Sequence, residues 1–292
     1  REGMIRSLGL TNFDTAHLRV VRASGVEVVS NQVSFSLFDR RAAGAMSELC
    51  QEYGVKLLAY GTLAGGLLTD RFLGQPEPAA MTTWSEMKYK RFLDTAGSWE
   101  SYQDLLKVLR SVADRHGVSI ANVASRYILE QPAVGGVIIG ARLGESAHIE
   151  ENLELFGFSL SAADRAEIEA PLAGFAAIPG DCGDEYRQPP FLTASGDLSH
   201  HFESFPAPYD VRDLGDGRQR VLSGTHWEEE FGYCRAIRRG STVRVSGTTA
   251  SHGDRLIGGT DAAAQAHFAI DKIEGAIQSL GGRLADVVRT RV

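Results

Sequence analysis

The stretch from Leu57 to Thr69, LLAYGTLAGGLLT, combines an apolar run with a loop of small residues. The run from Lys56 to Tyr60 has the character of a β-strand, and Gly61 begins the loop that follows it. Backbone N–H groups in such a loop can hold a phosphate, because no side chain obstructs the close approach of a ligand. A tight connection from a strand to a helix needs the same residue types. Both interpretations therefore stay open for the loop alone.

Other combinations of reactive residues in the sequence are weaker. The three cysteines, Cys50, Cys182 and Cys234, are far apart and form no Cys-x-x-Cys pair, which argues against a disulfide framework or a zinc knuckle and favours a cytoplasmic protein. Ser199 to His201, with Asp181 and Cys182 upstream, could ligate a metal, but the surrounding Pro and Gly residues favour a solvated loop. The sequence contains no P-loop, H-E-x-x-H or G-x-S-x-G motif.

The composition limits the class of protein. A chain of 292 residues is long enough for one large domain or two ordinary ones, and 43% hydrophobic and 23% charged residues indicate a globular protein. The net charge of −7 argues against nucleic-acid binding, which requires a basic face. No apolar run is long enough to cross a bilayer, so we expect no membrane partner. Small-molecule chemistry is the expectation that remains.

From residue 1 to about 172, predicted strands and helices alternate, which indicates parallel strands joined by crossover helices. The pattern predicts strands over residues 5–13, 26–34, 55–61 and 134–141, the last with burial on both faces. It predicts helices over residues 14–24, 40–54, 99–117, 119–131, 146–156 and 161–173. Asp14 is expected to begin the first helix and Gly54 to end the second, whereas residues 73–92 are expected to be irregular.

The periodicity ends after about residue 172. Residues 173–218 are rich in Pro, Gly, Asp and Ser, which predicts a linker or the tail of the first domain. A second unit over residues 219–292 is predicted to contain two strands joined at Arg239 and Gly240, a helix over 261–282 and a further strand over 286–292. The acidic run from Trp227 to Phe231 is expected to be an exposed turn.

Five motifs occur in a specific order: LGLTNF, NQVSFSLFDRR, LLAYGTLAGGLLT, GVSIANVASRYILEQP and VIIGAR followed by IEENL. Because of these motifs and their order, the first part of the chain resembles the C-terminal half of the proteins of the aldo-keto reductase family. The resemblance implies an α/β fold, here the last four strands of a partial TIM-type (β/α)8 barrel, which binds NADPH at the carboxyl ends of the strands.

The resemblance also implies roles for individual residues. Thr11, in place of the commoner serine, and Asn12 would contact the nicotinamide carboxamide together with Gln32, and Tyr60 would stack on the nicotinamide ring. Without the resemblance, Gln32 could be an ordinary polar residue and Tyr60 part of the core. The implied contacts beside the pyrophosphate are Gly61, Thr62, Leu63, Ala64, Gly65 and Leu67.

At the adenosine end, the resemblance implies that Arg142 pairs with a 2′-phosphate and that Glu151 and Asn152 contact the adenine. Here the sequence departs from the family, because the loop from Arg142 to Asn152 is longer and His148 replaces a common glutamine. The implied preference for NADPH over NADH is therefore only partly supported by the sequence.

The family's proton-donating Tyr and its Lys, Asp and His partners lie on the first four strands of the barrel. We expect this chain to begin just before the fifth strand and so to be a fragment without catalytic residues, inactive on its own. Tyr89, Lys90, Asp184 and Tyr186 do not follow the family's motif, and we expect them to be surface or loop residues.

The second unit, over residues 219–292, resembles the first half of the Rid family of reactive-intermediate deaminases. The matching stretches are SGTHWEEEFGYCRAIRRGSTVRVSGTTA, AQAHFAIDKIEGAIQSLGG and DVVRTRV. The resemblance implies a partial α+β domain related to enzymes that hydrolyse imines and enamines between the subunits of a trimer. Tyr233 and Ser246 would line that cleft, whereas Arg289 and Arg291 are expected to be ordinary strand residues.

Three hypotheses follow. The first is an NADPH-dependent oxidoreductase that transfers hydride to a small carbonyl compound. The second is imine or enamine hydrolysis by the Rid-like unit, and the third is a remnant without catalysis. Because four parallel strands cannot close a barrel, we also expect self-association, either through the exposed strand edges or through a Rid-like trimer.

Overall fold

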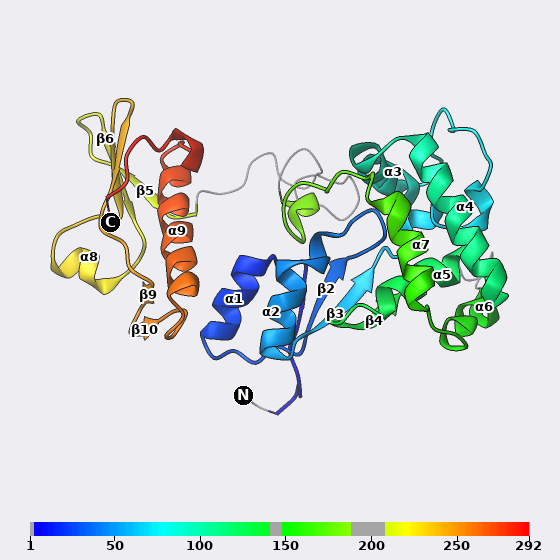
Figure 1. Cartoon of the computed structure of the whole chain (residues 1–292). Helices are drawn as coiled ribbons and strands as arrows, with labels where there is room; N and C mark the ends of the chain where they lie inside the picture. The colour runs from blue at the N-terminus through cyan, green and yellow to red at the C-terminus, as the bar shows by residue number, and fades with distance from the viewer. Residues whose placement is uncertain (1–2, 141–147, 188–207, 292) are drawn as a thin grey trace. The chain divides into compact units, whose positions relative to one another are not determined.

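The computed structural model describes residues 3–140, 148–187 and 208–291 (Figure 1). The chain divides into two compact units. The first comprises residues 1–15 and 27–200, and the second comprises residues 16–26 and 201–292. Among the residues that the structure describes, no helix is both long enough and apolar enough to cross a membrane.

The sheet of the first unit contains four parallel strands in the order β1-β2-β3-β4. Their bounds are Gly9–Thr11 for β1, Ser30–Ser34 for β2, Lys56–Tyr60 for β3 and Val134–Ile138 for β4. The register pairs Thr11 with Gln32, and Ser34 with Tyr60. Thr11 and Tyr60 are the last residues of β1 and β3, and Gln32 lies level with Leu58, two residues before the end of β3. The predicted alternation of strands and helices is confirmed, and the α/β fold with it.

Helices connect and follow these strands. Their bounds are α1 Thr15–Ala23, α2 Ala45–Tyr53, α3 Trp84–Ala96, α4 Trp99–His116, α5 Ile120–Leu129, α6 Ile149–Leu153 and α7 Ala162–Leu172. Short 3-10 helices occupy Arg41–Ala43, Ala64–Gly66, Asp70–Phe72, Glu154–Phe156 and Asp184–Tyr186. The predicted end of α2 at Gly54 is confirmed, because this glycine has a φ of 68° and its N–H donates to the last turn of the helix.

The core of the first unit lies between the sheet and its helices. Helix α2 packs against β3, α5 packs against β4, and α4 packs against α5 and α7. Leu57 and Ala59 of β3 and Leu105 and Leu109 of α4 are fully buried. Tyr102 is also buried, and its hydroxyl donates to the carbonyl of Leu67 at 2.5 Å. This bond ties α4 to the loop that follows β3.

Helix α3 is a correction to the sequence analysis, which predicted irregular structure over residues 73–92. The Thr83 side chain accepts a hydrogen bond from the Glu86 N–H, and the Glu86 carboxylate accepts one from the Thr83 N–H. This capping box stabilises the first turn of a helix. The signal was present in the sequence as Thr-x-x-Glu, but the Pro and Gly residues before it concealed it.

Two further expectations for the first unit were wrong. The helix predicted over residues 40–54 is broken at Gly44, whose φ of −92° and ψ of −119° separate the 3-10 helix from α2. Strand β4 is not buried on both faces, because Ile138 is 42% exposed. In the described sheet, β4 is an edge strand and β3 is its single neighbour.

The second unit is built on an antiparallel sheet in the order β5-β6-β7-β8. The bounds are β5 Asp210–Asp213, β6 Arg218–Leu222, β7 Ala236–Arg239 and β8 Thr242–Val245. The remaining elements are α8 His226–Glu230, β9 Ser251–His252, β10 Arg255–Leu256, α9 Ala262–Ser279 and a 3-10 helix Leu284–Asp286. Val221 and Ala236 of the sheet pack against Ala276 and Leu280 near the C-terminal end of α9. The predicted strand pair around Gly240 and the long helix are confirmed.

Three expectations for this part of the chain were wrong. Strand β5 and the start of β6 lie in the stretch predicted as a linker, because turn residues at Gly215 and Gly217 join paired strands there. No strand forms over the described residues 286–291. The run from Trp227 to Phe231 lies mostly in α8, and Glu228 is buried because it accepts hydrogen bonds from the N–H groups of Ser223 and Gly224.

Candidate functional site

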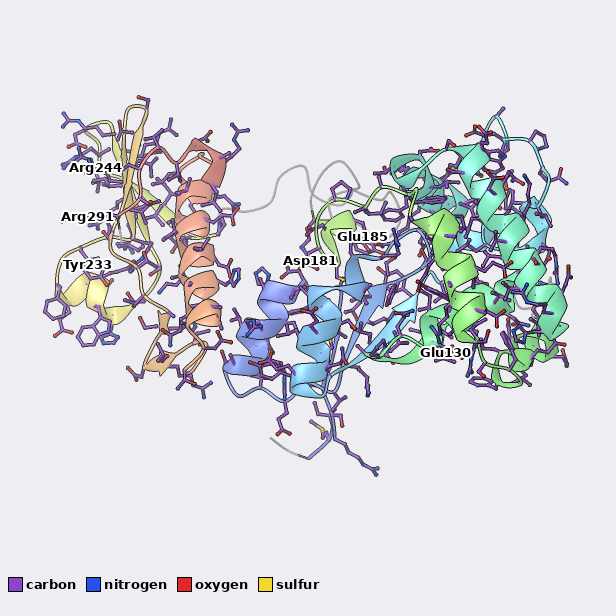
Figure 2. The ribbon with its side chains drawn as sticks, in the orientation of Figure 1. Glu130, Asp181, Glu185, Tyr233, Arg244 and Arg291 are labelled. Carbon is purple, nitrogen blue, oxygen red and sulfur yellow. The ribbon has the colours of Figure 1, made fainter. Side chains whose placement is uncertain are left out.

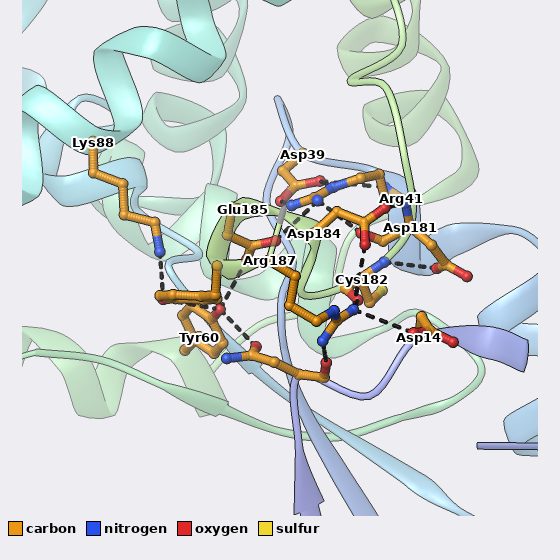
Figure 3. Close-up of polar contacts among 12 residues, drawn as sticks. Asp14, Asp39, Arg41, Tyr60, Lys88, Asp181, Cys182, Asp184, Glu185 and Arg187 are labelled. Atoms are coloured by element: carbon orange, nitrogen blue, oxygen red, sulfur yellow. Dashed lines mark hydrogen bonds and ion pairs between the residues drawn. The ribbon is translucent and has the colours of Figure 1, made fainter. Parts of the chain in front are cut away.

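Polar and aromatic side chains meet at the carboxyl edge of the parallel sheet (Figure 3). Asn12 directly follows β1 and has a φ of 57°, a left-handed conformation that asparagine tolerates. Its N–H donates to the carbonyl of Gln32 at 2.8 Å. The hydroxyl of Tyr60, the last residue of β3, lies 2.8 Å from Oδ1 of Asn12. The structure therefore joins Asn12 to the Tyr60 hydroxyl and to the backbone carbonyl of Gln32.

The Tyr60 hydroxyl also has partners from later in the chain. Oε1 of Glu185 lies 3.0 Å away and the hydroxyl of Tyr186 lies 3.4 Å away. Burial and then the negative charge of Glu185 raise the pKa of Tyr60 above its ordinary value. Tyr60 is therefore a neutral phenol with a flat ring at neutral pH.

Glu185 belongs to a buried ionic network. Nη1 of Arg41 lies 2.9 Å from Oε2 of Glu185, and Nη2 of Arg41 lies 2.6 Å from Oδ2 of Asp39. All three side chains are at most 3% exposed. Burial alone would lower the pKa of Arg41. The hydrogen bonds and charge interactions with Asp39 and Glu185 outweigh burial, so the pKa of Arg41 is raised above its ordinary value. Because two carboxylates face one guanidinium, the Tyr60 hydroxyl is well placed to donate to the excess negative charge.

Residues Asp181 to Arg187, here called the 181–187 segment, pack on this edge of the sheet (Figure 3). Oδ2 of Asp181 accepts from the Thr15 N–H at 2.8 Å. Nη1 of Arg187 donates to the carbonyl of Asn12 at 2.5 Å. Residues 173–218 were expected to be a linker or the tail of the first domain, and the 181–187 segment contributes to the polar edge of the first unit.

The prediction that Tyr89 and Tyr186 are surface or loop residues was wrong. Nζ of Lys88 donates to the Tyr186 hydroxyl at 2.7 Å, and the same ammonium lies 5.3 Å from the centre of the Tyr60 ring. Tyr89 is 6% exposed. Lys90, by contrast, forms ion pairs with exposed carboxylates, and Asp184 accepts from the Asp181 N–H within its own turn. Sequence reasoning missed Glu185 and Tyr186 because their stretch has no periodicity.

The glycine-rich loop after β3 is explained largely by packing. A Cβ atom at Gly61 would lie 2.1 Å from the Tyr89 hydroxyl oxygen, and one at Gly65 would lie 2.8 Å from the Ser85 carbonyl oxygen. Both glycines also have positive φ values, 69° and 67°. Close approach of α3 therefore requires glycine at both positions.

The other predicted loop residues lie around these glycines. Leu67, Ala64 and Thr62 are buried, whereas Leu63 is half-buried. The hydroxyl of Thr62 is buried without a hydrogen-bond partner. The N–H groups of Ala64 and Gly66 donate to carbonyls of the loop itself. These two donors stabilise the turn.

The residues predicted at the adenosine end are only partly described. Arg142 lies outside the described residues. Glu151 and Asn152 lie in α6, where Oε2 of Glu151 is 2.7 Å from Nδ1 of His148. Within the described chain, no contact joins Glu151 or Asn152 to Tyr60. The structure therefore does not bring the two ends of the predicted site into contact.

In the second unit, Tyr233 and Ser246 flank the start of β7 and the end of β8 (Figure 2 labels Tyr233). The Ser246 hydroxyl donates to the Cys234 carbonyl at 2.7 Å, and the Arg235 guanidinium lies 5.7 Å from the centre of the Tyr233 ring. Arg235 is buried beside Glu228, with Nε 3.5 Å from the carboxylate. The Ser246 hydroxyl is therefore committed to a backbone partner.

The described residues contain no group of three His, Cys, Asp or Glu side chains that could hold a metal ion. The possible metal ligands Ser199 to His201 lie outside the described residues. Cys182 is buried, and burial raises the pKa of its thiol. A neutral thiol of this kind is a poor nucleophile.

Comparisons with known proteins agree with this architecture. Residues 1–172 match the model of the aldo/keto reductase family. Protein tas of Escherichia coli is 30% identical over 176 residues, which cover 58% of this chain and 49% of that protein. The NADH-specific methylglyoxal reductase of Escherichia coli is 26% identical over 166 residues, which cover 56% of this chain and 47% of that protein.

Among solved structures, the glycerol dehydrogenase AKR11B4 from Gluconobacter oxydans is 23% identical with a TM-score of 0.49. The match covers 62% of this chain and 53% of that chain. This chain thus spans about half the length of these relatives. The family match extends over more than half of the 292 residues. The chain belongs to the aldo/keto reductase family.

Proposed function

We propose that this chain forms the coenzyme-binding part of an NADPH-dependent oxidoreductase that transfers hydride to a carbonyl compound. The observation that carries the proposal is the convergence of Asn12, Gln32 and Tyr60 at the carboxyl edge of the parallel sheet. Members of this family typically use NADH or NADPH. The bound coenzyme would supply the hydride.

The residues at this edge fit a nicotinamide. The side-chain amide of Gln32 makes no hydrogen bond to another described residue, so its donor and acceptor are available to a carboxamide. The ring of Tyr60 is held by the hydrogen bonds of its hydroxyl and stays neutral. A fixed neutral ring is suited to stacking on a flat ligand. These two residues would therefore orient the nicotinamide.

The 181–187 segment would form a wall of this site. Arg187 contacts the carbonyl of Asn12 and lies 3.3 Å from the Asp14 carboxylate and 3.4 Å from the Asp184 carboxylate, whereas Lys88 contacts the Tyr186 hydroxyl. The Lys88 ammonium, which forms no ion pair with a described residue, favours an anionic dinucleotide nearby. We propose that Arg142, with Glu151 and Asn152, selects the adenosine 2′-phosphate of NADPH. Because one relative is named as specific for NADH, both coenzymes belong in the test.

The proposal assigns binding and orientation to this chain and assigns no proton donor. The raised pKa of Tyr60 disfavours the phenolate that proton transfer from its hydroxyl would leave. We propose that residues 1–172 are the last four strands of a (β/α)8 barrel and that the proton comes from elsewhere in the parent enzyme. The purified chain is therefore expected to bind coenzyme without reducing carbonyl compounds.

Titration of the full chain with NADPH, followed by nucleotide fluorescence, tests the proposal. We expect saturation, with binding weakened at least about tenfold by Gln32→Ala or Tyr60→Ala, which corresponds to about 1.4 kcal/mol. Gln51→Ala is a matched control, because this exposed glutamine of α2 bonds only the Ser47 carbonyl one turn earlier. Absence of saturation, or equal losses in all three variants, would contradict the proposal. A parallel titration with NADH measures coenzyme preference.

A second candidate function concerns residues 219–292, which we propose to be a Rid-like α+β domain. The pairing of β7 with β8 and the packing of α9 against the sheet support this assignment. Tyr233 and Ser246 would line its cleft. An imino acid generated by an amino-acid oxidase is the appropriate substrate, and faster ammonia release with this chain than with a Ser246→Ala variant would support hydrolysis.

We also propose that the chain self-associates. In the described sheet of the first unit, β1 and β4 are edge strands, and exposed edges favour pairing with another chain. A Rid-like trimer is the alternative route. Light scattering after size exclusion is expected to give more than one copy per particle, and a single sharp monomer peak would contradict this expectation.

A further inference from the structure

One face of the antiparallel sheet in the second unit carries an unusual density of arginines. Helix α9 packs on the face that contains Val221, Ala236, Val243 and Val245. Side chains alternate along each strand, so the residues between these lie on the opposite face. The arginines of the opposite face are Arg212, Arg218, Arg220, Arg239 and Arg244. Figure 2 shows the labelled Arg244 on the side of the sheet away from α9.

Three of these arginines lie in one row across the sheet. The register pairs Arg212 of β5 with Arg220 of β6, Arg220 with Ile237 of β7, and Ile237 with Arg244 of β8. We call Arg212, Arg220 and Arg244 the arginine row. Neighbouring strands are about 4.8 Å apart, so the row extends over roughly 14 Å.

None of the three guanidinium groups forms an ion pair or a side-chain hydrogen bond with another residue in the described part of the chain. Arg220 is half-buried, and its Nε is buried without a partner. Arg218 pairs with Asp216 at 2.6 Å and Arg283 pairs with Asp286 at 3.0 Å, whereas Arg239 on the same face, like the arginine row, forms no ion pair with a described residue. The arginine row therefore has unused hydrogen-bond donors, and one of them, Nε of Arg220, is buried.

Unpaired like charges in register destabilise a sheet, and a buried donor without a partner adds to the cost. A bound anion removes both penalties. Guanidinium groups bind phosphate and carboxylate oxygens through two parallel hydrogen bonds, which favours arginine at such sites. Phosphate groups carry more charge per group than carboxylates, so three neighbouring cations favour a phosphate-bearing ligand.

We propose that the arginine row is a binding site for a small molecule that carries two or more phosphate groups. Arg212 and Arg220 lie on adjacent strands, whereas Ile237 separates Arg220 from Arg244 by two strand spacings, about 10 Å, so a ligand needs more than one phosphate group to reach all three. A long nucleic acid fits less well, because the chain has a net charge of −7. A second copy of this face is also disfavoured, because it would place arginines opposite arginines.

Isothermal titration of the full chain with inorganic tripolyphosphate at physiological salt tests the proposal. We expect saturable binding that Arg220→Gln and Arg244→Gln each weaken at least about tenfold. Arg218→Gln and Arg283→Gln are matched controls, because each removes an exposed arginine with an acidic partner, and they should change the affinity less than about twofold. Far-UV circular dichroism checks that each variant retains its fold.

Further measurements separate this site from the coenzyme site. Tyr60→Ala should leave tripolyphosphate binding unchanged, so failure of NADPH binding and failure of this proposal are distinguishable. Several results would overturn the proposal: no saturation at physiological salt, equal losses in control and row variants, or tighter competition by single-stranded nucleic acid than by tripolyphosphate. The proposal would also be overturned if the chain forms a trimer that does not change when tripolyphosphate is added and does not bind tripolyphosphate.

Discussion

The hydroxyl of Tyr60 lies 2.8 Å from Oδ1 of Asn12, so the last residue of β3 holds the residue after β1 in its left-handed conformation. Tyr60 therefore has two roles that can be tested separately: its hydroxyl contacts Asn12, and its ring is proposed to stack on the nicotinamide. Tyr60→Phe keeps the ring, and we expect its NADPH affinity to stay within about threefold of wild type, whereas Tyr60→Ala should lose about tenfold or more. Fluorescence titration of both variants checks this, and equal losses would argue against stacking.

Arg41 is expected to be essential for the stability of the first unit. Replacement by Met leaves the buried carboxylates of Asp39 and Glu185 without their partner, which should lower the free energy of unfolding by about 3–5 kcal/mol. Arg40→Met is the control, because Arg40 donates only one long hydrogen bond, 3.3 Å to the Leu172 carbonyl, and should cost about 1 kcal/mol. Urea denaturation followed by tryptophan fluorescence compares the two. Similar losses would contradict the role of the network.

Glu86 should make stability depend on acidic pH. Burial opposes its ionisation, but hydrogen bonds from Arg71, Thr82 and Thr83 outweigh burial and lower its pKa from 4.5 to about 2. Because the folded pKa is the lower one, the stabilisation is complete above about pH 4.5 and disappears as the pH falls towards 2.

The matched variants are Glu86→Gln and Glu100→Gln, the second on the exposed first turn of α4. Glu86→Gln should lower the free energy of unfolding by about 2 kcal/mol at pH 7, with the difference from wild type shrinking by pH 3. Glu100→Gln should differ little from wild type at either pH. Thermal melts across this range provide the measurement, and a pH-independent loss in Glu86→Gln would refute the assignment.

A comparison of Gly61 with Gly74 distinguishes two reasons for glycine, the lack of space for a side chain and the positive φ of the backbone. Both have similar positive φ values, 69° and 72°, but a Cβ at Gly61 would meet the Tyr89 hydroxyl at 2.1 Å, whereas a Cβ at Gly74 has no neighbour within 4 Å. Gly74→Ala should cost about 1 kcal/mol from backbone strain alone. Gly61→Ala should cost about 1–3 kcal/mol more because α3 must shift. Chemical denaturation of both variants tests this, and equal costs would remove the packing explanation.

Much of the fold could be predicted from the sequence. Buried strands such as Lys56–Tyr60 and amphipathic helices such as Trp99–His116 follow from local periodicity, and Gly54 and Gly117 end their helices as glycine commonly does. Helix α3 was missed, although Thr83 and Glu86 form a capping box that is legible in the sequence. Strand β5 was missed because its four residues are all exposed and leave no apolar pattern.

The candidate site was predictable only in part. The family motifs identify Asn12, Gln32 and Tyr60, and parallel strands bring them to one edge without further information. Glu185 and Tyr186 could not be found in this way, because their positions depend on long-range contacts with Arg41 and Lys88. No local pattern encodes such contacts.

The distance along the chain between Tyr60 and Glu185 has a consequence for biosynthesis. The two residues are separated by 125 positions. At synthesis rates of about 5–20 residues per second, roughly 6–25 s pass between their additions to the growing polypeptide. During that interval Arg41 pairs with Asp39 alone and the Tyr60 hydroxyl lacks its later acceptor, so the polar edge of the sheet is completed only after residue 185 has been added.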